Sequence, residues 1–167
     1  MIRLYETSSA PAVVGQTMGV SHWIDVPQLR ITEFGRVTED PDLMHIDPDW
    51  AAENSPYGKT IAFGFLTVSL LTRMINDVVA RPSDEVSTLN YGFDRLRLLA
   101  PVLVGSRVRG HFVLKELAMR SPTQYRGKFG VTVEIDGKDK PALVADWLVV
   151  TNVREARPPL AGAAVAS

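Results

Sequence analysis

The longest apolar run of the chain covers residues 61–80 and predicts a buried helix. Its first half is apolar on nearly every side, whereas its second half narrows to one stripe at residues 71–78. Apolar positions three and four residues apart share one face of a helix, so the first turns should be wholly enclosed. The run is about as long as a membrane span, but Arg73, Asn76 and Asp77 lie within it, and such groups are costly in lipid. We therefore expect a helix in a protein core.

Runs of alternating apolar and polar residues predict β-strands on both sides of this helix. They cover residues 15–24, 89–99, 106–117, 124–135 and 142–153. Side chains at every second position of a strand point to the same face, so these strands together have an apolar face that must be covered. We therefore predict an α+β domain in which an antiparallel sheet wraps around one long central helix.

A polar segment rich in Asp, Pro and Gly separates the first strand from the central helix. Asp25 is a candidate N-cap for a short helix that ends near residue 34. Residues 37–58 then predict a long loop that holds one short helix at about residues 49–53, with Asp47 as its N-cap. Long ordered loops in compact domains are often functional, so this loop is the first place to look for a site.

The composition is that of a globular protein, and it excludes several classes of chemistry. The 167 residues suit one domain, which we place at residues 1–153, followed by a mobile tail at residues 154–167. No cysteine is present, so disulfides, thiolate metal sites and a cysteine nucleophile are excluded. The net charge of −1 and the lack of a basic tract give nucleic-acid binding little support.

The histidines and the N-terminal segment bear on metal binding and on cellular location. Three histidines without any cysteine offer no cluster of metal ligands. His22 and His111 lie in predicted strands without an evident partner, and we interpret both as ordinary surface residues. The N-terminal segment lacks the long apolar core of a signal peptide, so we expect a cytoplasmic protein with no membrane span.

Three segments of the chain, taken in order, carry a family pattern. The first, DPDLMHIDP at residues 40–48, has an Asp, four intervening residues, a His and a short apolar-Asp-Pro run. The second, YGKTIAFGFLTVSL at residues 57–70, runs into the predicted central helix, and the third, at residues 90–109, covers the strand that follows it. Together they resemble the MaoC-like family of (R)-specific enoyl-CoA hydratases, particularly its branch similar to nodulation protein N. The Asp–x4–His spacing alone is common by chance, so the ordered combination carries the resemblance.

The chain departs from the family pattern at three places. Asp42, Leu43 and Met44 stand where many members carry Asn-Pro-Leu, and Glu39 stands where Gly is frequent. Phe63 stands where a His usually precedes the glycine of the helix. This last change removes a polar group near the mouth of the site, so we expect it to shift substrate preference or weaken activity.

The family reaction is hydration of a conjugated thioester, and the resemblance assigns its chemistry to Asp40 and His45. A carboxylate and an imidazole can hold one water between them and move protons at neutral pH. The order of the proton steps stays open. Gly64 lies at the expected start of the buried helix, where its unpaired N–H and the helix dipole would stabilise the negative charge on the thioester oxygen. No cofactor is required, because water is the only second reactant.

The resemblance also points to residues that would line the substrate site. Tyr57, Gly58 and Phe63 flank the start of the predicted helix, and Asn90 and Tyr91 are candidates for the acyl pocket. Simpler explanations apply to several of them, because glycines form turns and a strand tyrosine usually packs. Without the resemblance, an Asp or a His in a Pro-rich loop would also be interpreted as a turn former or an N-cap.

The family implies a hot-dog fold and reversible addition of water to a trans-2-enoyl thioester, giving a (3R)-hydroxyacyl thioester. The substrate would be an acyl-CoA or an acyl-carrier-protein thioester. The family also implies a homodimer whose two sheets join edge to edge, and an open sheet edge favours such pairing. Two alternatives stay open: a hot-dog acyl-CoA thioesterase, whose carboxylate acts on the thioester carbon, and a non-catalytic subunit that only binds acyl thioesters.

Overall fold

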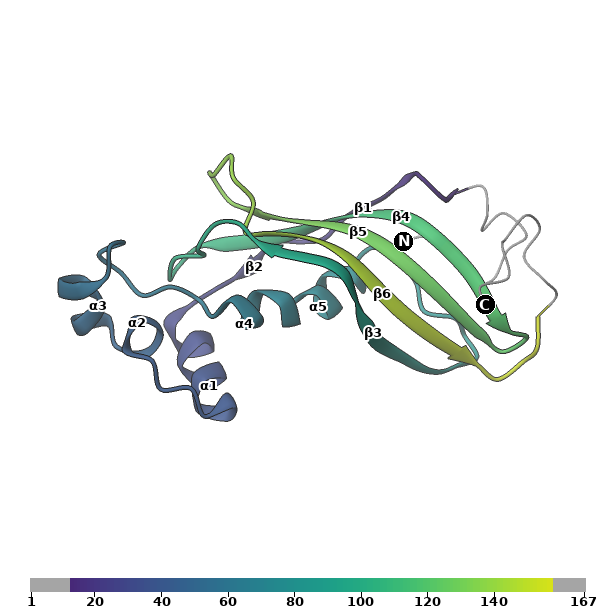
Figure 1. Cartoon of the computed structure of the whole chain (residues 1–167), viewed down its shortest axis with the longest axis horizontal. Coiled ribbons are helices and arrows are strands. Elements are labelled where there is room, and N and C mark those ends of the chain that lie inside the picture. The colour runs from purple at the N-terminus through teal and green to yellow at the C-terminus, as the bar shows by residue number, and fades with distance from the viewer. Residues whose placement is uncertain (1–12, 158–167) are drawn as a thin grey trace.

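A curved antiparallel sheet wraps around two short helices in the computed structural model, which describes residues 13–157 (Figure 1). Its six strands are β1 (Thr17–Val20), β2 (Ile24–Asp25), β3 (Glu85–Leu98), β4 (Arg107–Ser121), β5 (Gln124–Ile135) and β6 (Leu143–Val153). The strand order is β1-β4-β5-β6-β3, and β2 also pairs with β4. Every pairing is antiparallel, so the predicted α+β arrangement is confirmed.

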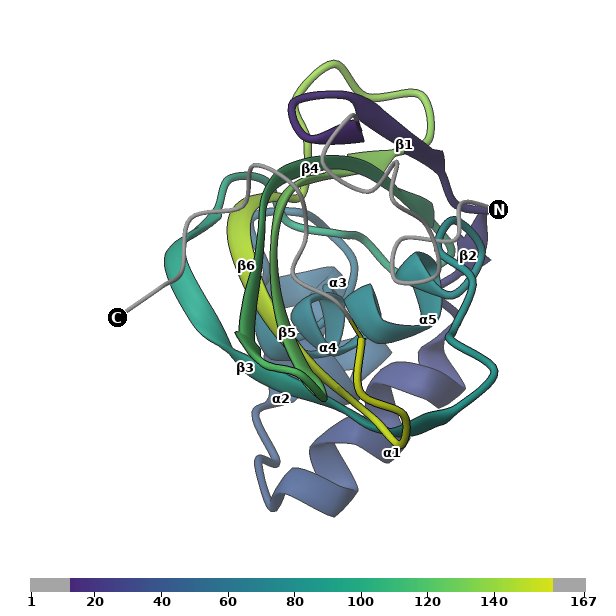
Figure 2. The same ribbon diagram turned by 90° about the vertical axis from the view of Figure 1, so that its right-hand side faces the viewer.

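The helices enclosed by the sheet are α4 (Gly64–Ser69) and α5 (Leu71–Ile75), joined through Leu70, which keeps right-handed helical torsions. Figure 2 looks along the sheet and shows both helices inside its curve. The prediction of one long helix over residues 61–80 is therefore wrong in extent. Its first residues are extended instead, because Ile61 forms a bridge with Leu103 and the N–H of Ala62 donates to a carbonyl of the same neighbouring segment.

The core lies between these helices and the inner face of the sheet. Leu71 and Met74 of α5 are at most 1% exposed, and so are Phe112 and Phe129 on the facing strands. Burial of each such side chain stabilises the fold by about 1.5–3 kcal/mol. Gly110 allows the close approach of β4, since a Cβ there would lie 2.7 Å from the Phe112 ring and 3.1 Å from the sulfur of Met74. This close packing fixes the orientation of α5 relative to the sheet.

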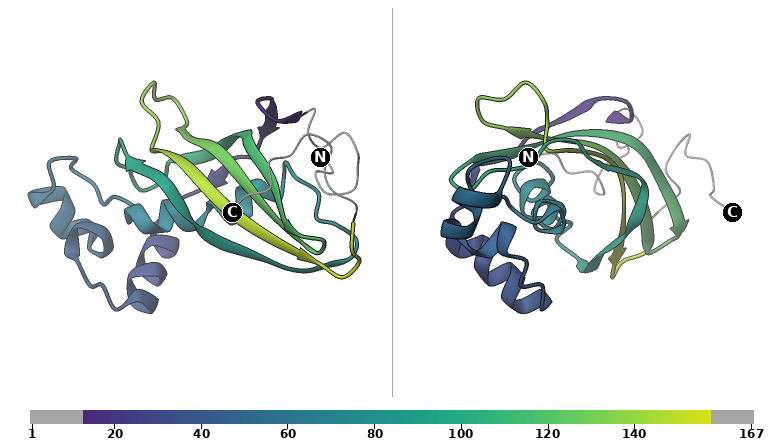
Figure 3. Two further views of the ribbon diagram at one scale, coloured as in Figure 1. Left: turned by 45° about the vertical axis from the view of Figure 1, so that its right-hand side comes forward. Right: turned by 60° about the vertical axis from the view of Figure 1, so that its left-hand side comes forward.

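Three more helices form a lobe at one end of the sheet: α1 (Gln28–Thr38), α2 (Leu43–Ile46) and α3 (Pro48–Asn54) (Figure 3). The predicted helix start at Asp25 is wrong, because Asp25 pairs with Arg107 in β2 and Pro27 occupies the N-cap position of α1. The helix also runs past residue 34. Helix α1 begins later than predicted because Asp25 is paired in a strand.

The segment between α1 and α4 was predicted to be a loop with one helix, and this is wrong in one respect: α2 precedes α3 there. The four residues of α2 are too few for a periodic pattern to be visible in the sequence. The predicted N-cap of the second helix is confirmed, since the side chain of Asp47 accepts a hydrogen bond from the N–H of Trp50 at 2.9 Å.

Part of the segment predicted as a tail is held against the sheet. The N–H of Arg154 donates to the carbonyl of Asp84, and the guanidinium of Arg157 lies 2.5 Å from the carboxylate of the same residue. Residues 1–12 and 158–167 lie outside the described part of the chain. Within residues 13–157, no helix is long and apolar enough to cross a membrane.

His22 and His111 have acidic partners, which corrects the prediction that they have none, and only His111 lies in a strand, because His22 falls between β1 and β2. His22 lies 3.2 Å from the carboxylate of Asp77. On the outer face of the sheet, His111 lies 2.6 Å from Glu134, which also accepts hydrogen bonds from Arg109 at 2.7 and 3.2 Å. The hydrogen bonds from Arg109 and then His111 lower the pKa of Glu134 below its ordinary value of 4.5.

The lowered pKa makes a test of the outer cluster possible. A depressed carboxyl pKa stabilises the fold above about pH 4.5, and this contribution is lost as the pH falls through the folded-state pKa. The Glu134→Gln variant should therefore unfold about 0.5–1 kcal/mol more easily at pH 7, with the gap closing below about pH 4. Urea unfolding across pH measures it. The control Asp139→Asn, at an exposed carboxylate, should show no such gap, and an equal gap at all pH values would contradict the assignment.

Candidate active site

Asp40 stands at a sharp corner after helix α1. The helix ends at Thr38, and Glu39 adopts a left-handed conformation with φ of 56°. The N–H of Asp40 then donates to the carbonyl of Gly35 at 2.9 Å, which closes the helix end. The Asp40 side chain is exposed, so its carboxylate is available at the surface of the lobe.

Gly35 is a positioning residue of this corner that the sequence reasoning missed. It is buried, and a Cβ there would lie 2.8 Å from the carbonyl of Asp40, 2.9 Å from the ring of Phe63 and 3.1 Å from Ile46. Gly35 directly follows the predicted end of the helix near residue 34, where a glycine indicates a C-cap, so the pattern gave no signal of this close approach. Through Gly35, the corner at Asp40 packs directly on the segment that precedes helix α4.

His45 lies in the last turn of α2, and its ring is held from two sides. Its Nδ1 lies 2.7 Å from the carbonyl oxygen of Ile61, and its ring stacks on Phe63 with the centroids 3.9 Å apart. A carbonyl can only accept, so Nδ1 carries the hydrogen and the neutral ring keeps its lone pair on Nε2. The imidazole is therefore fixed in one tautomer and one orientation.

Gln28 and Thr60 hold the backbone around His45. The amide of Gln28, at the start of α1, donates to the carbonyl of His45 at 2.8 Å. The hydroxyl of Thr60, which is buried, donates to the carbonyl oxygen of the Gln28 side chain at 2.5 Å. This chain of bonds ties α1, α2 and the approach to α4 together. No sequence pattern indicated it, since the three segments are remote from one another.

Asp42, one of the three departures from the family pattern, has a clear local role. Its carboxylate accepts a hydrogen bond from the N–H of Met44 at 2.9 Å and so caps α2. Asn and Asp are similarly good N-caps, so the exchange preserves the helix that carries His45.

Gly64 is the first residue of α4, and its environment explains why a glycine stands there. A Cβ would lie 2.3 Å from a terminal methyl of Leu98 on β3, so any side chain at this position would displace the half-exposed Leu98 side chain. Among the described residues, none accepts a hydrogen bond from the N–H of Gly64. The position thus combines close packing with a free backbone donor.

Phe63 fills the place where the family usually has His. It is 5% exposed, and its ring lies between Phe34, at a centroid distance of 5.3 Å, and His45. The aromatic ring offers no hydrogen bond to a substrate, but it packs against the imidazole of His45. The loss of a polar group is therefore accompanied by a packing role.

The remaining predicted site residues separate into two groups. Asn90 lies on the inner side of β3, where its amide donates to Thr72 at 3.4 Å and it lines a cavity beside α5. Tyr91 is 55% exposed, with the guanidinium of Arg120 over its ring, and it does not line that cavity.

Tyr57 and Gly58 lie on an exposed turn. The positive φ of Gly58, 63°, explains its glycine, with no neighbour within 4 Å of its Cβ position.

The structure thus brings His45 and Phe63 into contact directly before α4, which begins at Gly64. The backbone carbonyl of Asp40 lies beside Gly35, near the ring of Phe63, and the exposed Asp40 side chain makes no hydrogen bond or ion pair with His45 in the described part of the chain. A family model described as "MaoC like domain" matches residues 9–135 of the chain. The chain belongs to the MaoC-like family. As a member it is an enzyme of the hydratase and dehydratase class of lyases.

Curated relatives support membership over nearly the whole chain. Nodulation protein N of Rhizobium meliloti is 40% identical over 155 residues, which cover 93% of this chain and 96% of that protein. The 3-hydroxyacyl-thioester dehydratase Z of Mycobacterium tuberculosis is 34% identical over 149 residues, covering 89% and 97%. Both the MaoC-like family and its nodulation protein N branch, predicted from the sequence, are therefore confirmed.

Solved structures of the MaoC-like family confirm the hot-dog fold. The (R)-hydratase of A. caviae that is involved in PHA biosynthesis matches with a TM-score of 0.64 at 20% identity, covering 84% of this chain and 96% of that one. At this identity the likeness shows the fold alone. It places the sheet and the enclosed helices of the chain in the expected hot-dog arrangement.

The capping role of Asp42 leads to a test with a built-in control. Asp42→Ala should destabilise the protein by about 0.5–2 kcal/mol, because α2 loses its side-chain cap, whereas Asp42→Asn should stay within a few tenths of a kcal/mol of the original. Thermal unfolding of the two variants measures the difference. Equal losses in both would contradict the role of Asp42 as a cap.

Proposed function

We propose that the chain is an (R)-specific enoyl-CoA hydratase, which adds water to a trans-2-enoyl thioester and forms a (3R)-hydroxyacyl thioester. The observation that carries the proposal is the imidazole of His45, whose Nδ1 is bonded to the carbonyl of Ile61 at 2.7 Å. This bond leaves Nε2 as the proton acceptor on a ring that stacks on Phe63. We assign the second group to Asp40, whose exposed carboxylate follows the end of α1.

The two side chains have complementary roles in the proposed reaction. Nε2 of His45 accepts a proton from water while the carboxylate of Asp40 accepts the other hydrogen bond of that water and orients it. The water oxygen bonds to the β-carbon, and the electron pair of the double bond moves toward the thioester oxygen. The α-carbon then takes a proton, which restores neutral His45, so the elements of one water are added and none is left over. The reverse sequence is dehydration.

Gly64 is proposed to stabilise the enolate that forms during this step. Its N–H opens the first turn of α4 and has no acceptor among the described residues. A backbone donor that needs no reorganisation is well suited to charge that develops on an oxygen. The absence of a side chain at Gly64 also keeps the backbone accessible to the ligand.

The names of the relatives agree with this chemistry. One is a 3-hydroxyacyl-thioester dehydratase, and a structural neighbour is an (R)-hydratase, which are the two directions of one reaction. We therefore expect the substrate of this chain to be an acyl-CoA or acyl-carrier-protein thioester. The cytoplasmic location expected from the sequence belongs to the same proposal.

Substitution of the two proposed catalytic residues tests the mechanism. Asp40→Asn and His45→Asn should each lower kcat for hydration of crotonyl-CoA by about 10²–10⁴-fold, because each removes a group that moves or orients the proton. Loss of the conjugated absorbance measures turnover. The matched control Asp49→Asn changes an exposed carboxylate on α3 and should keep its activity. Full activity in Asp40→Asn would sink the assignment.

The same assay separates the proposed function from the two alternatives. A hydratase removes the absorbance of crotonyl-CoA without releasing thiol. A thioesterase releases free CoA and forms no hydroxyacyl product. A non-catalytic subunit binds acyl-CoA without either change.

We further infer that two copies of the chain pair through strand β3. This strand lies at one end of the sheet order, where β6 is its neighbour. It exposes large apolar side chains that are more than half accessible: Val86, Leu89, Tyr91 and Leu98. A long apolar edge favours pairing with another strand, and a second copy supplies an identical one. A partner there would also exclude water from the neighbourhood of Leu98 and Gly64, where the reaction is proposed.

A charge placed on this edge should weaken the dimer. Leu89→Lys should raise the dimer dissociation constant at least tenfold, because Lys opposes the pairing of an edge strand, and activity per chain should fall on dilution. Light scattering after size-exclusion chromatography measures the mass. Val37→Lys, on the exposed side of α1, is the control. A monomeric original protein at micromolar concentration would contradict the inference.

A further inference from the structure

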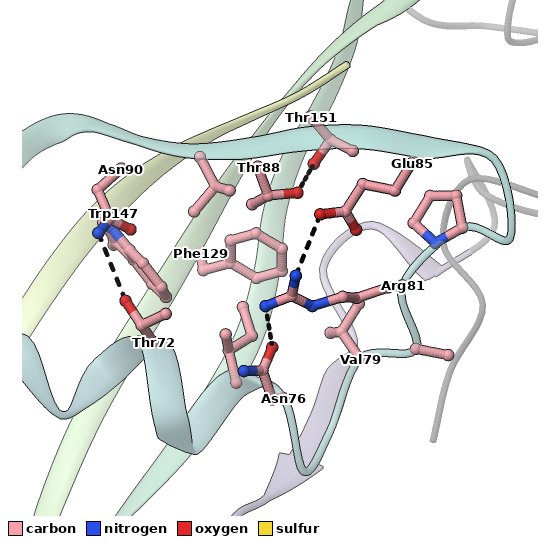
Figure 4. Close-up of a pocket in the computed structure, with 14 residues that line it drawn as sticks. Thr72, Asn76, Val79, Arg81, Glu85, Thr88, Asn90, Phe129, Trp147 and Thr151 are labelled. Carbon is pink, nitrogen blue, oxygen red and sulfur yellow. Dashed lines mark hydrogen bonds and ion pairs between the residues drawn. The ribbon is translucent and has the colours of Figure 1, made fainter. Parts of the chain in front are cut away.

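A hollow that opens to solvent lies between α5 and the inner face of the sheet (Figure 4). Its walls on the sheet side are apolar and include Phe129, Trp147 and Val149. It begins at Thr72, eight residues after Gly64. Eight residues of helix span about 12 Å, so an acyl chain whose thioester lies at Gly64 would reach the hollow with its distal half.

The other end of the hollow is polar, which a site for a plain alkyl chain does not need. Arg81 reaches the carboxylate of Glu85 at 3.3 Å and the side-chain oxygen of Asn76 at 3.5 Å, and both contacts are long (Figure 4). The hydroxyls of Thr88 and Thr151 share one hydrogen bond of 3.2 Å in the same wall. This end of the hollow therefore holds both hydrogen-bond donors and acceptors, and the charges of Arg81 and Glu85 offset each other.

Glu85 is the least satisfied of these groups. Its side chain is 10% exposed, while the side chain of its partner Arg81 is 60% exposed. Among the described residues, none bonds the second carboxylate oxygen of Glu85, Oε2, which is buried. A buried acceptor without a donor costs about 1–3 kcal/mol, so a donor brought by a ligand would be favourable.

We propose that this hollow receives the distal part of an acyl chain that carries a hydroxyl group, with Glu85 and Asn76 as specificity-determining residues. The inference rests on the proposed function and names the class of its substrate. A hydroxyl both donates and accepts, so it can bond the carboxylate of Glu85 and the amide nitrogen of Asn76. The exposed guanidinium of Arg81 shifts to admit it.

The charges at the polar end favour a neutral group over an ionised one. Because Arg81 and Glu85 lie together, a terminal carboxylate or ammonium would meet one opposite charge and one like charge, and it would compete with the existing ion pair. Each would also bring a charge into a partly dry site, which is costly. A plain methyl end would leave the polar groups without a ligand bond, so it gains less than in an apolar pocket.

Binding, measured without turnover, tests the proposal. The probes are saturated ω-hydroxyacyl-CoAs of medium and long chain, each compared by calorimetry with its unsubstituted partner. The original protein should bind the best hydroxylated probe about five- to tenfold tighter than its partner. In Glu85→Met, which keeps the length of the side chain and removes its oxygens, the preference should reverse by about tenfold, since a buried hydroxyl then lacks a partner.

A matched control and a second variant make each result decisive. Glu116→Met makes the same change at an exposed carboxylate that pairs with Lys128, and it should keep the original preference. Val149→Phe narrows the hollow and should weaken both members of each long-chain pair. The proposal is overturned if the original protein prefers every unsubstituted probe, if Glu85→Met leaves the preference unchanged, or if folded Val149→Phe binds both normally.

The outcomes also separate this inference from the proposed function. A protein that hydrates crotonyl-CoA but shows no preference for hydroxylated chains keeps the function and loses the inference. A protein that binds hydroxylated chains through Glu85 without hydrating any enoyl-CoA loses the function, while the binding site stands.

Discussion

The fold depends on enclosing the apolar face of α4 and α5, where Leu66, Leu71 and Met74 are buried. The expectation that the first turns would be wholly enclosed is wrong, because Phe65 is 73% exposed. A flat sheet covers one side of a helix, whereas the strongly curved sheet of this chain covers several. Close approach is needed along the seam, and glycine provides it at Gly110 against α5 and at Gly64 against β3. The enclosed helix then has a fixed position. The residues that contact its first turn and the segment before it are fixed with it.

The candidate active site is attached in this way. His45 belongs to the helical lobe, but its Nδ1 bonds the carbonyl of Ile61, three residues before α4 begins. Gly35 brings the corner at Asp40 against Phe63, the neighbour of Gly64. These contacts fix the ring of His45 and the backbone at Asp40 relative to the core of the domain. Long ordered loops can carry catalytic groups only when they are fixed in such a manner.

The sequence predicted most of the sheet and less of the helices. Residues 124–135 alternate regularly and form β5 with the predicted bounds, because strand periodicity is a local property. The start of the central helix was misplaced because residues 61–62 pair with a segment some forty residues away, which no local pattern reports. The catalytic candidates came from a family resemblance. Gly35, Gln28 and Thr60 escaped notice, since their contacts join remote segments.

The bond between His45 and Ile61 links two properties that are often treated as independent. One end of the segment from Ile61 to α5 carries the acceptor that orients the His45 ring, the proposed catalytic base, and the other end forms a wall of the hollow proposed to receive the acyl chain. A change that widens the hollow by moving the whole segment would also move the carbonyl of Ile61 that holds the imidazole. Changes on the sheet side, at Trp147 or Val149, leave the ring untouched. Substitutions in the strands can therefore change which substrates fit the hollow. Substitutions that move the helix would also change the rate of the proposed reaction.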